Sequence, residues 1–118
     1  MFLVCVPVLG EAWDIYKENW VQLDAPRHFV LHTKKSMGIL AEKTGFTVAK
    51  TIFDSTAFQF WGSELYERDI PLTLPRTHQM YPIEEIFTPD ELDGFGKRSA
   101  ALNGKQRGDS ARFYLYKK

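Results

Sequence analysis

The sequence is poor in the features that mark several classes of protein. It contains one cysteine in 118 residues, which excludes a disulfide scaffold within the chain and favours a reducing compartment, so we expect the cytoplasm. No apolar run approaches the roughly 20 residues of a membrane-spanning helix, so no membrane contact is expected. Fifteen basic residues balance fifteen acidic ones, and this zero net charge gives no electrostatic reason to expect nucleic acid as a partner.

What the sequence does contain is the composition of one globular domain. Hydrophobic residues make up 44% of the chain and charged residues 25%, which is enough apolar material for a core and too little charge for a disordered chain. The length suits a single domain over residues 1–118 and is too short for two of ordinary size. No internal repeat or low-complexity segment divides it.

Three segments have the pattern of β-strands. Residues 2–8 are apolar on both faces, and they lack the basic flank and the small-residue cleavage site of a signal peptide, so they predict a buried strand. Cys5 within this strand is expected to be buried and inert. Residues 46–55 and 110–116 alternate in side-chain character and are rich in β-branched or aromatic residues, which indicates two further strands.

Helices are expected between these strands, over residues 11–19, 33–44 and 57–69 and from residue 88 to the exit at Gly104. Thr33 is a suitable N-cap and Gly45 a suitable left-handed C-cap for the second of them. Thr88 and Glu91 form a capping box at the start of the last helix, with Pro89 at its first position. The order of elements is that of an α/β protein.

Two segments resemble a known family. The first covers residues 19–28 and ends in Asp24-Ala25-Pro26-Arg27-His28; the second covers residues 36–46 and ends in Thr44-Gly45-Phe46. With the strand that closes in Val6-Pro7, they resemble the C-terminal half of class I S-adenosylmethionine-dependent methyltransferases, in the bacterial ubiquinone-biosynthesis-type branch. Thr44 departs from the alanine that is usual in the turn of that family.

The resemblance extends over essentially the whole chain and implies its fold. It implies the C-terminal part of a Rossmann-like methyltransferase sheet, an α/β arrangement of three strands with about three to four helices. The last strand, residues 110–116, would lie in the middle and run antiparallel to residues 2–8 and 46–55.

The cofactor-binding part of this family is missing from the sequence. The family binds S-adenosylmethionine through a glycine-rich turn after the first strand and an acidic residue after the second, because close backbone approach needs glycine. Only Gly94-Phe95-Gly96 comes near the glycine pattern, and it falls inside a predicted helix. We therefore expect no cofactor in this chain and S-adenosylmethionine in a full-length parent. No metal is expected either, since His28 and His32 lack a third ligand.

Candidate substrate-binding residues follow the carboxyl ends of the two parallel strands, where ligands of open α/β sheets gather. They are Trp13, Tyr16, Trp20, Asp24, Arg27, His28 and Trp61. The aromatic residues would line the pocket of a small-molecule acceptor, and His28 could act as a general base or orient the substrate. Each residue type also has a structural interpretation: aromatic side chains pack cores, His28 can bond the backbone of a turn, and Asp24 can hold Arg27. No catalytic residue is assigned.

Two functions stay open at this point. The resemblance implies the acceptor side of a methyltransferase that transfers methyl groups to a small molecule in its full-length parent, with this chain alone inactive. The alternative is a non-catalytic interaction module that acts through homo-oligomerisation or a partner chain. In both cases residues 2–8 would form an apolar edge strand without a charged residue, and we expect a homo-oligomer through it.

Overall fold

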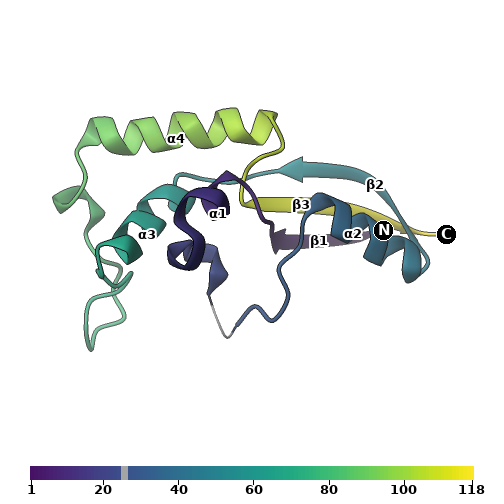
Figure 1. Cartoon of the computed structure of the whole chain (residues 1–118), viewed down its shortest axis with the longest axis horizontal. Helices are drawn as coiled ribbons and strands as arrows, with labels where there is room; N and C mark the ends of the chain where they lie inside the picture. The colour runs from purple at the N-terminus through teal and green to yellow at the C-terminus, as the bar shows by residue number, and fades with distance from the viewer. Residues whose placement is uncertain (25–26) are drawn as a thin grey trace.

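The computed structural model describes residues 1–24 and 27–118, and its three strands form one antiparallel sheet in the order β1-β3-β2 (Figure 1). The elements in chain order are β1 (Phe2–Pro7), α1 (Glu11–Tyr16), η1 (Lys17–Asn19), η2 (Val21–Leu23), α2 (Lys34–Lys43), β2 (Phe46–Phe53), α3 (Phe58–Glu67), η3 (Ile83–Glu85), α4 (Pro89–Gly104) and β3 (Ser110–Lys117), where η marks a short 3-10 helix. The described residues thus hold four α-helices, and the predicted α/β class and number of helices are confirmed.

The last strand in the sequence lies in the middle of the sheet, as predicted. β3 runs antiparallel to both neighbours, with Phe113 opposite Val4 of β1 on one side and opposite Thr51 of β2 on the other. β1 and β2 therefore run parallel to each other without being adjacent. Both point toward the end of the molecule where α1 and α3 lie (Figure 1).

One core lies between the sheet and α2. Alternation along β3 turns Ala111, Phe113 and Leu115 to the same face, where all three are buried against Met37 and Ala41 of α2. Side chains of β1 and β2 pack around this cluster and are only partly buried. The apolar stripe of α2 therefore holds the helix on the central strand and on β2.

The ends of α2 follow the expected capping chemistry. Thr33 Oγ1 accepts a hydrogen bond from the backbone N–H of Ser36 at 3.0 Å, and Ser36 Oγ accepts one from the N–H of Thr33 at 2.8 Å. Gly45 follows the helix with φ of 83°, the left-handed conformation that favours glycine. The chain can therefore turn directly from α2 into β2.

A second core joins α1, α3 and α4. Its buried members include Ala12 and Tyr16 of α1, Phe60 of α3, Leu102 of α4 and Trp20 between the two 3-10 helices. The predicted capping box starts α4: Thr88 Oγ1 accepts from the N–H of Glu91, and the Glu91 carboxylate accepts from the N–H of Thr88. This cluster lies beyond the carboxyl ends of β1 and β2 (Figure 1).

The structure corrects three expectations. Cys5 is exposed rather than buried, because β1 is an edge strand and the side chain points away from the face that α2 covers. The alternation of β2 is broken by a register shift between Val48 and Lys50. The first helix is shorter than predicted, since α1 ends at Tyr16 and the chain continues as two 3-10 turns.

Ala25 and Pro26 of the Asp-x-Pro-x-His motif lie outside the described residues.

The described residues contain no helix that is both long enough and apolar enough to cross a membrane. The longest helix, α4, carries charged residues along its length, among them Asp93 and Lys97, which form a surface ion pair at 2.7 Å.

Candidate functional site

The carboxyl ends of β1 and β2 meet the start of β3 in a tightly closed junction. A Cβ added at Gly10 would lie 2.4 Å from the carbonyl oxygen of Gly108, and one added at Gly108 would lie 2.2 Å from Ser55 Oγ. The Asn103 side chain accepts from the N–H of Ser55 and donates to the carbonyl of the same residue, both at 2.9 Å. This junction is filled by its own backbone and leaves no room for a ligand.

Asp109 lies at the buried centre of this junction. Trp20 Nε1 donates a hydrogen bond to Asp109 Oδ2 at 3.0 Å, and both side chains are buried. Burial raises the pKa of the Asp109 carboxyl, and the hydrogen bonds from Trp20 and Ser55 offset this only in part. The indole therefore serves to satisfy a buried carboxylate, and Trp20 contributes no surface to a substrate pocket in this structure.

The other predicted aromatic residues divide between core and surface. Tyr16 is buried and its hydroxyl donates to Glu64 Oε1 at 2.9 Å. Burial raises the pKa of Tyr16, and the hydrogen bond to Glu64 raises it further, so the phenol stays protonated. Trp13 packs edge-on against Trp20, and Trp61 packs in the same way against Phe58; both keep part of their surface exposed.

Asp24 and Arg27 do lie together, beside a hollow of about 510 Å³. Arg27 Nη1 lies 3.6 Å from Asp24 Oδ2, and Tyr66 of α3 lines the same hollow. The remaining lining comes from η2, α3 and the segment after α3, namely Val21, Gln22, Phe58, Pro71, Leu72 and Thr73. Burial raises the pKa of Tyr66, the Asp24 carboxylate raises it further and Arg27 lowers it. The hollow thus offers a cation, an anion and a protonated phenol.

His28 and His32 do not line this hollow, although His28 contacts one of its lining residues, Gln22. His28 Nδ1 lies 3.0 Å from the carbonyl oxygen of Gln22, so the ring donates there when Nδ1 carries the proton. This is the backbone contact that the structural interpretation of His28 predicted. His32 Nδ1 lies 3.2 Å from Ser36 Oγ at the start of α2. Across residues 1–24 and 27–118 no group of three metal-binding side chains gathers.

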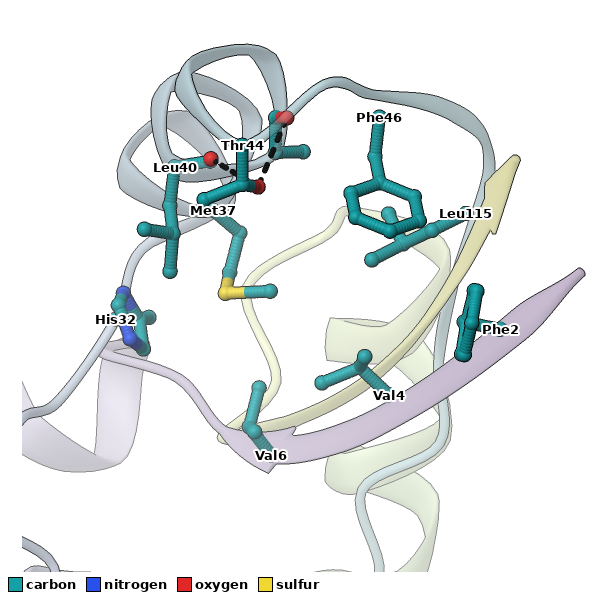
Figure 2. A pocket seen from close by; sticks show the side chains of 10 residues that line it. Phe2, Val4, Val6, His32, Met37, Leu40, Thr44, Phe46 and Leu115 are labelled. Carbon is teal, nitrogen blue, oxygen red and sulfur yellow. Dashed lines mark hydrogen bonds between the residues drawn. The ribbon is translucent and has the colours of Figure 1, made fainter. Parts of the chain in front are cut away.

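A second hollow, which sequence reasoning missed, lies between α2 and the outer part of the sheet. Figure 2 shows this groove, with a volume of about 380 Å³. Its lining is apolar except for His32 and Thr44 and consists of Phe2, Val4, Val6, His32, Met37, Leu40, Ala41, Thr44, Phe46 and Leu115. The groove exists because α2 packs over β3 and β2 and leaves the same face of β1 uncovered. No sequence pattern gives the lateral position of a helix on a sheet.

Comparison with known proteins gives no match: no family model, curated protein or solved structure matches the chain. The chemistry of the two hollows described above follows from the residues that line them. The hollow of Asp24, Arg27 and Tyr66 suits a small polar molecule, because its charged and hydroxyl groups can orient one. The groove beside β1 suits apolar material.

Proposed function

We propose that the chain is the acceptor-substrate side of an S-adenosylmethionine-dependent methyltransferase, with the cofactor held by a part of the enzyme outside this chain. The observation that carries the proposal is the strand order β1-β3-β2 with the last strand antiparallel in the middle, the arrangement that the family resemblance implies. The proposed setting is the cytoplasm, where the exposed thiol of Cys5 stays reduced.

The acceptor would bind in the hollow of Asp24, Arg27 and Tyr66. Methyl transfer from a sulfonium depends mainly on proximity and in-line orientation, so the site needs groups that hold the acceptor more than it needs a strong acid or base. The Tyr66 phenol, whose pKa burial raises further above neutral, can donate to an acceptor oxygen or nitrogen, and Arg27 can hold an anionic group. S-adenosylmethionine would supply the methyl group, and the residues of this chain would orient its recipient.

Nuclear magnetic resonance of the isotope-labelled chain tests this proposal. The probes are a panel of simple methyl acceptors: phenols, catechols, carboxylic acids and amines. At least one class is expected to shift the amide signals of Asp24, Arg27 and Tyr66 in a saturable way. Shifts that are absent for the whole panel, or that fall elsewhere on the chain, would contradict the acceptor site.

A variant pair separates specific binding from a general charge effect. Arg27→Ala should weaken binding of an anionic acceptor on the order of tenfold, since a charge-assisted hydrogen bond is worth about 1.5–3 kcal/mol. Lys35→Ala removes the same charge from the exposed face of α2 and should leave binding unchanged. Equal effects of both substitutions would point to non-specific attraction.

The same titration tests the position of the cofactor site. S-adenosylmethionine alone should cause no saturable shift. Gly10, which follows β1 and precedes α1, is a single glycine packed against the backbone of Gly108, and Gly94 and Gly96 lie within α4. Saturable binding at one molecule per chain would contradict the proposal that the cofactor is held elsewhere.

A second candidate function is a non-catalytic module that acts through self-association. The observation that favours it is the exposure of apolar residues along β1, where Phe2 is 58% exposed and Leu3 50% exposed. This candidate assigns the chain a homo-oligomeric state through its edge strand and needs no cofactor. Light scattering at tens of micromolar checks it, because a strictly monomeric chain would contradict it.

A further inference from the structure

The sheet has two edge strands, and only one of them carries protection against pairing. β2 has a register shift between Val48 and Lys50 and an exposed lysine at that point, two features that discourage the addition of another strand. β1 has no bulge and no charged side chain, and along residues 2–7 it pairs with β3 alone within the described part of the chain. Pro7 blunts only its last position.

The backbone of β1 has free hydrogen-bonding groups on its outer side. The N–H of Val8 donates to the carbonyl of Asp109 at 2.9 Å, so every second residue before it, Val6, Val4 and Phe2, also turns its backbone groups toward β3. The N–H and C=O groups of Leu3 and Cys5 therefore point to the free edge. At the far end this edge is already occupied, since the N–H of Leu9 donates to the carbonyl of His32.

These positions fix how a second β1 could pair in a two-fold arrangement. When Val4 lies opposite the partner's Val4, Leu3 lies opposite the partner's Cys5, and the two exchange both hydrogen bonds on each side of the axis. Phe2 then lies opposite the partner's Val6, so residues 2–6 of both strands pair completely. Pro7, which lacks a donor, stays outside the ladder.

Neighbouring registers fit less well. If Cys5 faced the partner's Cys5, the partner's Phe2 would lie opposite Val8, whose outer side His32 already occupies. If Leu3 faced the partner's Leu3, only residues 2–4 of each β1 would pair with one another. The register with Val4 on the axis is therefore the one that uses the whole free edge.

The groove beside β1 completes this arrangement. Val4 and Val6 line it on the face toward α2, as Figure 2 shows. Side chains alternate along a strand, so the partner's Phe2 points to the same face as Val6 when the two are opposite each other. Its ring would then cover the groove near His32 and Met37. The zero net charge of the chain adds no repulsion between copies.

We propose that a second copy of this chain pairs its β1 antiparallel with β1 of the first, with Val4 on the two-fold axis and the partner's Phe2 in the groove. The result is a continuous six-stranded sheet. This inference rests on the self-association candidate. It competes with the methyltransferase proposal for the β1 edge, where the rest of a methyltransferase sheet would join.

Cysteine cross-linking tests the register. In a Cys5→Ser background, Val4→Cys places two thiols on the axis with Cα atoms about 4.5 Å apart, at the short end of the range of about 4.4–6.8 Å that a disulfide accepts. The control Val6→Cys in the same background separates the two thiols by about 14 Å along the strands, which no disulfide spans. Mild oxidation should link the dimer of the first variant and leave the control unlinked.

An edge proline tests the pairing itself. Leu3→Pro removes an N–H that points to the free edge, so it breaks the dimer ladder without removing a hydrogen bond to β3. The control Thr51→Pro acts in the same way on the outer edge of β2. Light scattering should show a monomer for the first variant and a dimer for the control, with unchanged circular dichroism for both.

These experiments test self-association and the pairing of β1 with β1 separately. A wild-type chain that stays monomeric at tens of micromolar overturns both the pairing and the self-association candidate, and leaves the methyltransferase proposal standing. A dimer that neither cross-links through Val4→Cys nor dissociates with Leu3→Pro overturns the β1 pairing alone.

Discussion

Trp20 and Asp109 are 89 positions apart in the chain, and a single buried hydrogen bond of 3.0 Å joins them. It ties the 3-10 turns after α1 to the residue that directly precedes the central strand β3. Loss of this hydrogen bond would cost the most free energy at the Asp109 carboxylate, because a buried charge without its donor keeps its full desolvation penalty.

Removal of the donor should therefore destabilise the fold. Trp20→Phe deletes the indole N–H while it keeps an aromatic ring in the core, and we expect a loss of about 2–4 kcal/mol from the unsatisfied carboxylate and the smaller ring. Urea unfolding followed by circular dichroism measures this loss. Trp61→Phe, on the partly exposed surface of α3, is the control and should cost far less. Equal losses for the two variants would refute the role of the hydrogen bond.

The raised pKa of Asp109 gives the stability a defined pH dependence. The folded state binds the proton more tightly than the unfolded state, so this group contributes stability that is fully present below the unfolded pKa of about 3.9 and is lost as pH rises through the raised folded pKa. The stability of the wild type relative to Asp109→Asn should therefore increase as pH falls from neutral toward 4. A difference that stays constant or shrinks over this range would show that Asp109 is not desolvated.

Two of the five tyrosines should ionise last. Burial raises the pKa of Tyr16 and of Tyr66, and the carboxylates of Glu64 and Asp24, respectively, raise each further. In an alkaline titration followed by phenolate absorbance, Tyr16→Phe should remove the step at the highest pH. Tyr116→Phe, at an exposed position, should leave that step in place. Loss of an early step in the Tyr16 variant would contradict the burial of its hydroxyl.

Substitution of glycine should have opposite effects at two positions. Gly10 has φ of −130°, which any residue adopts, but a Cβ there would lie 2.4 Å from the carbonyl oxygen of Gly108; Gly10→Ala should cost about 2 kcal/mol or more. Gly94 lies within α4 with nothing within 4 Å of an added Cβ, so Gly94→Ala should gain about 0.5–1 kcal/mol. Thermal unfolding of both variants compares them, and a stable Gly10→Ala protein would show that the junction can relax.

Local signals in the sequence predicted the local structure well. The capping residues Thr33 and Thr88, and the left-handed Gly45, lie where their chemistry requires. The central position of β3 came from the family resemblance, because alternation alone predicts a strand and not its neighbours. The register shift of β2 between Val48 and Lys50 could not be predicted from the sequence. A strand whose side chains alternate in the sequence can still hold one extra residue in its pairing with β3.

The candidate site was predicted in part. Asp24 and Arg27 are close in sequence and also in space, whereas the contribution of Tyr66 depends on how α3 packs beside η2. Trp20 was a candidate for a substrate wall, and its burial reflects a partner 89 residues away that no local pattern could indicate. The groove of Figure 2 depends in the same way on the placement of α2 across the sheet.

The central position of β3 also governs when the sheet can form. β1 and β2 share no edge, so neither has a sheet partner until residues 110–117 join them. On a ribosome, the roughly 100 residues between β1 and β3 would be made before the first ladder could close, so the apolar β1 stays without a sheet partner during that interval. Formation of the sheet is thus a late event. Helix α2 completes its core only when β3 arrives, whereas α1, α3 and α4 pack in a core of their own.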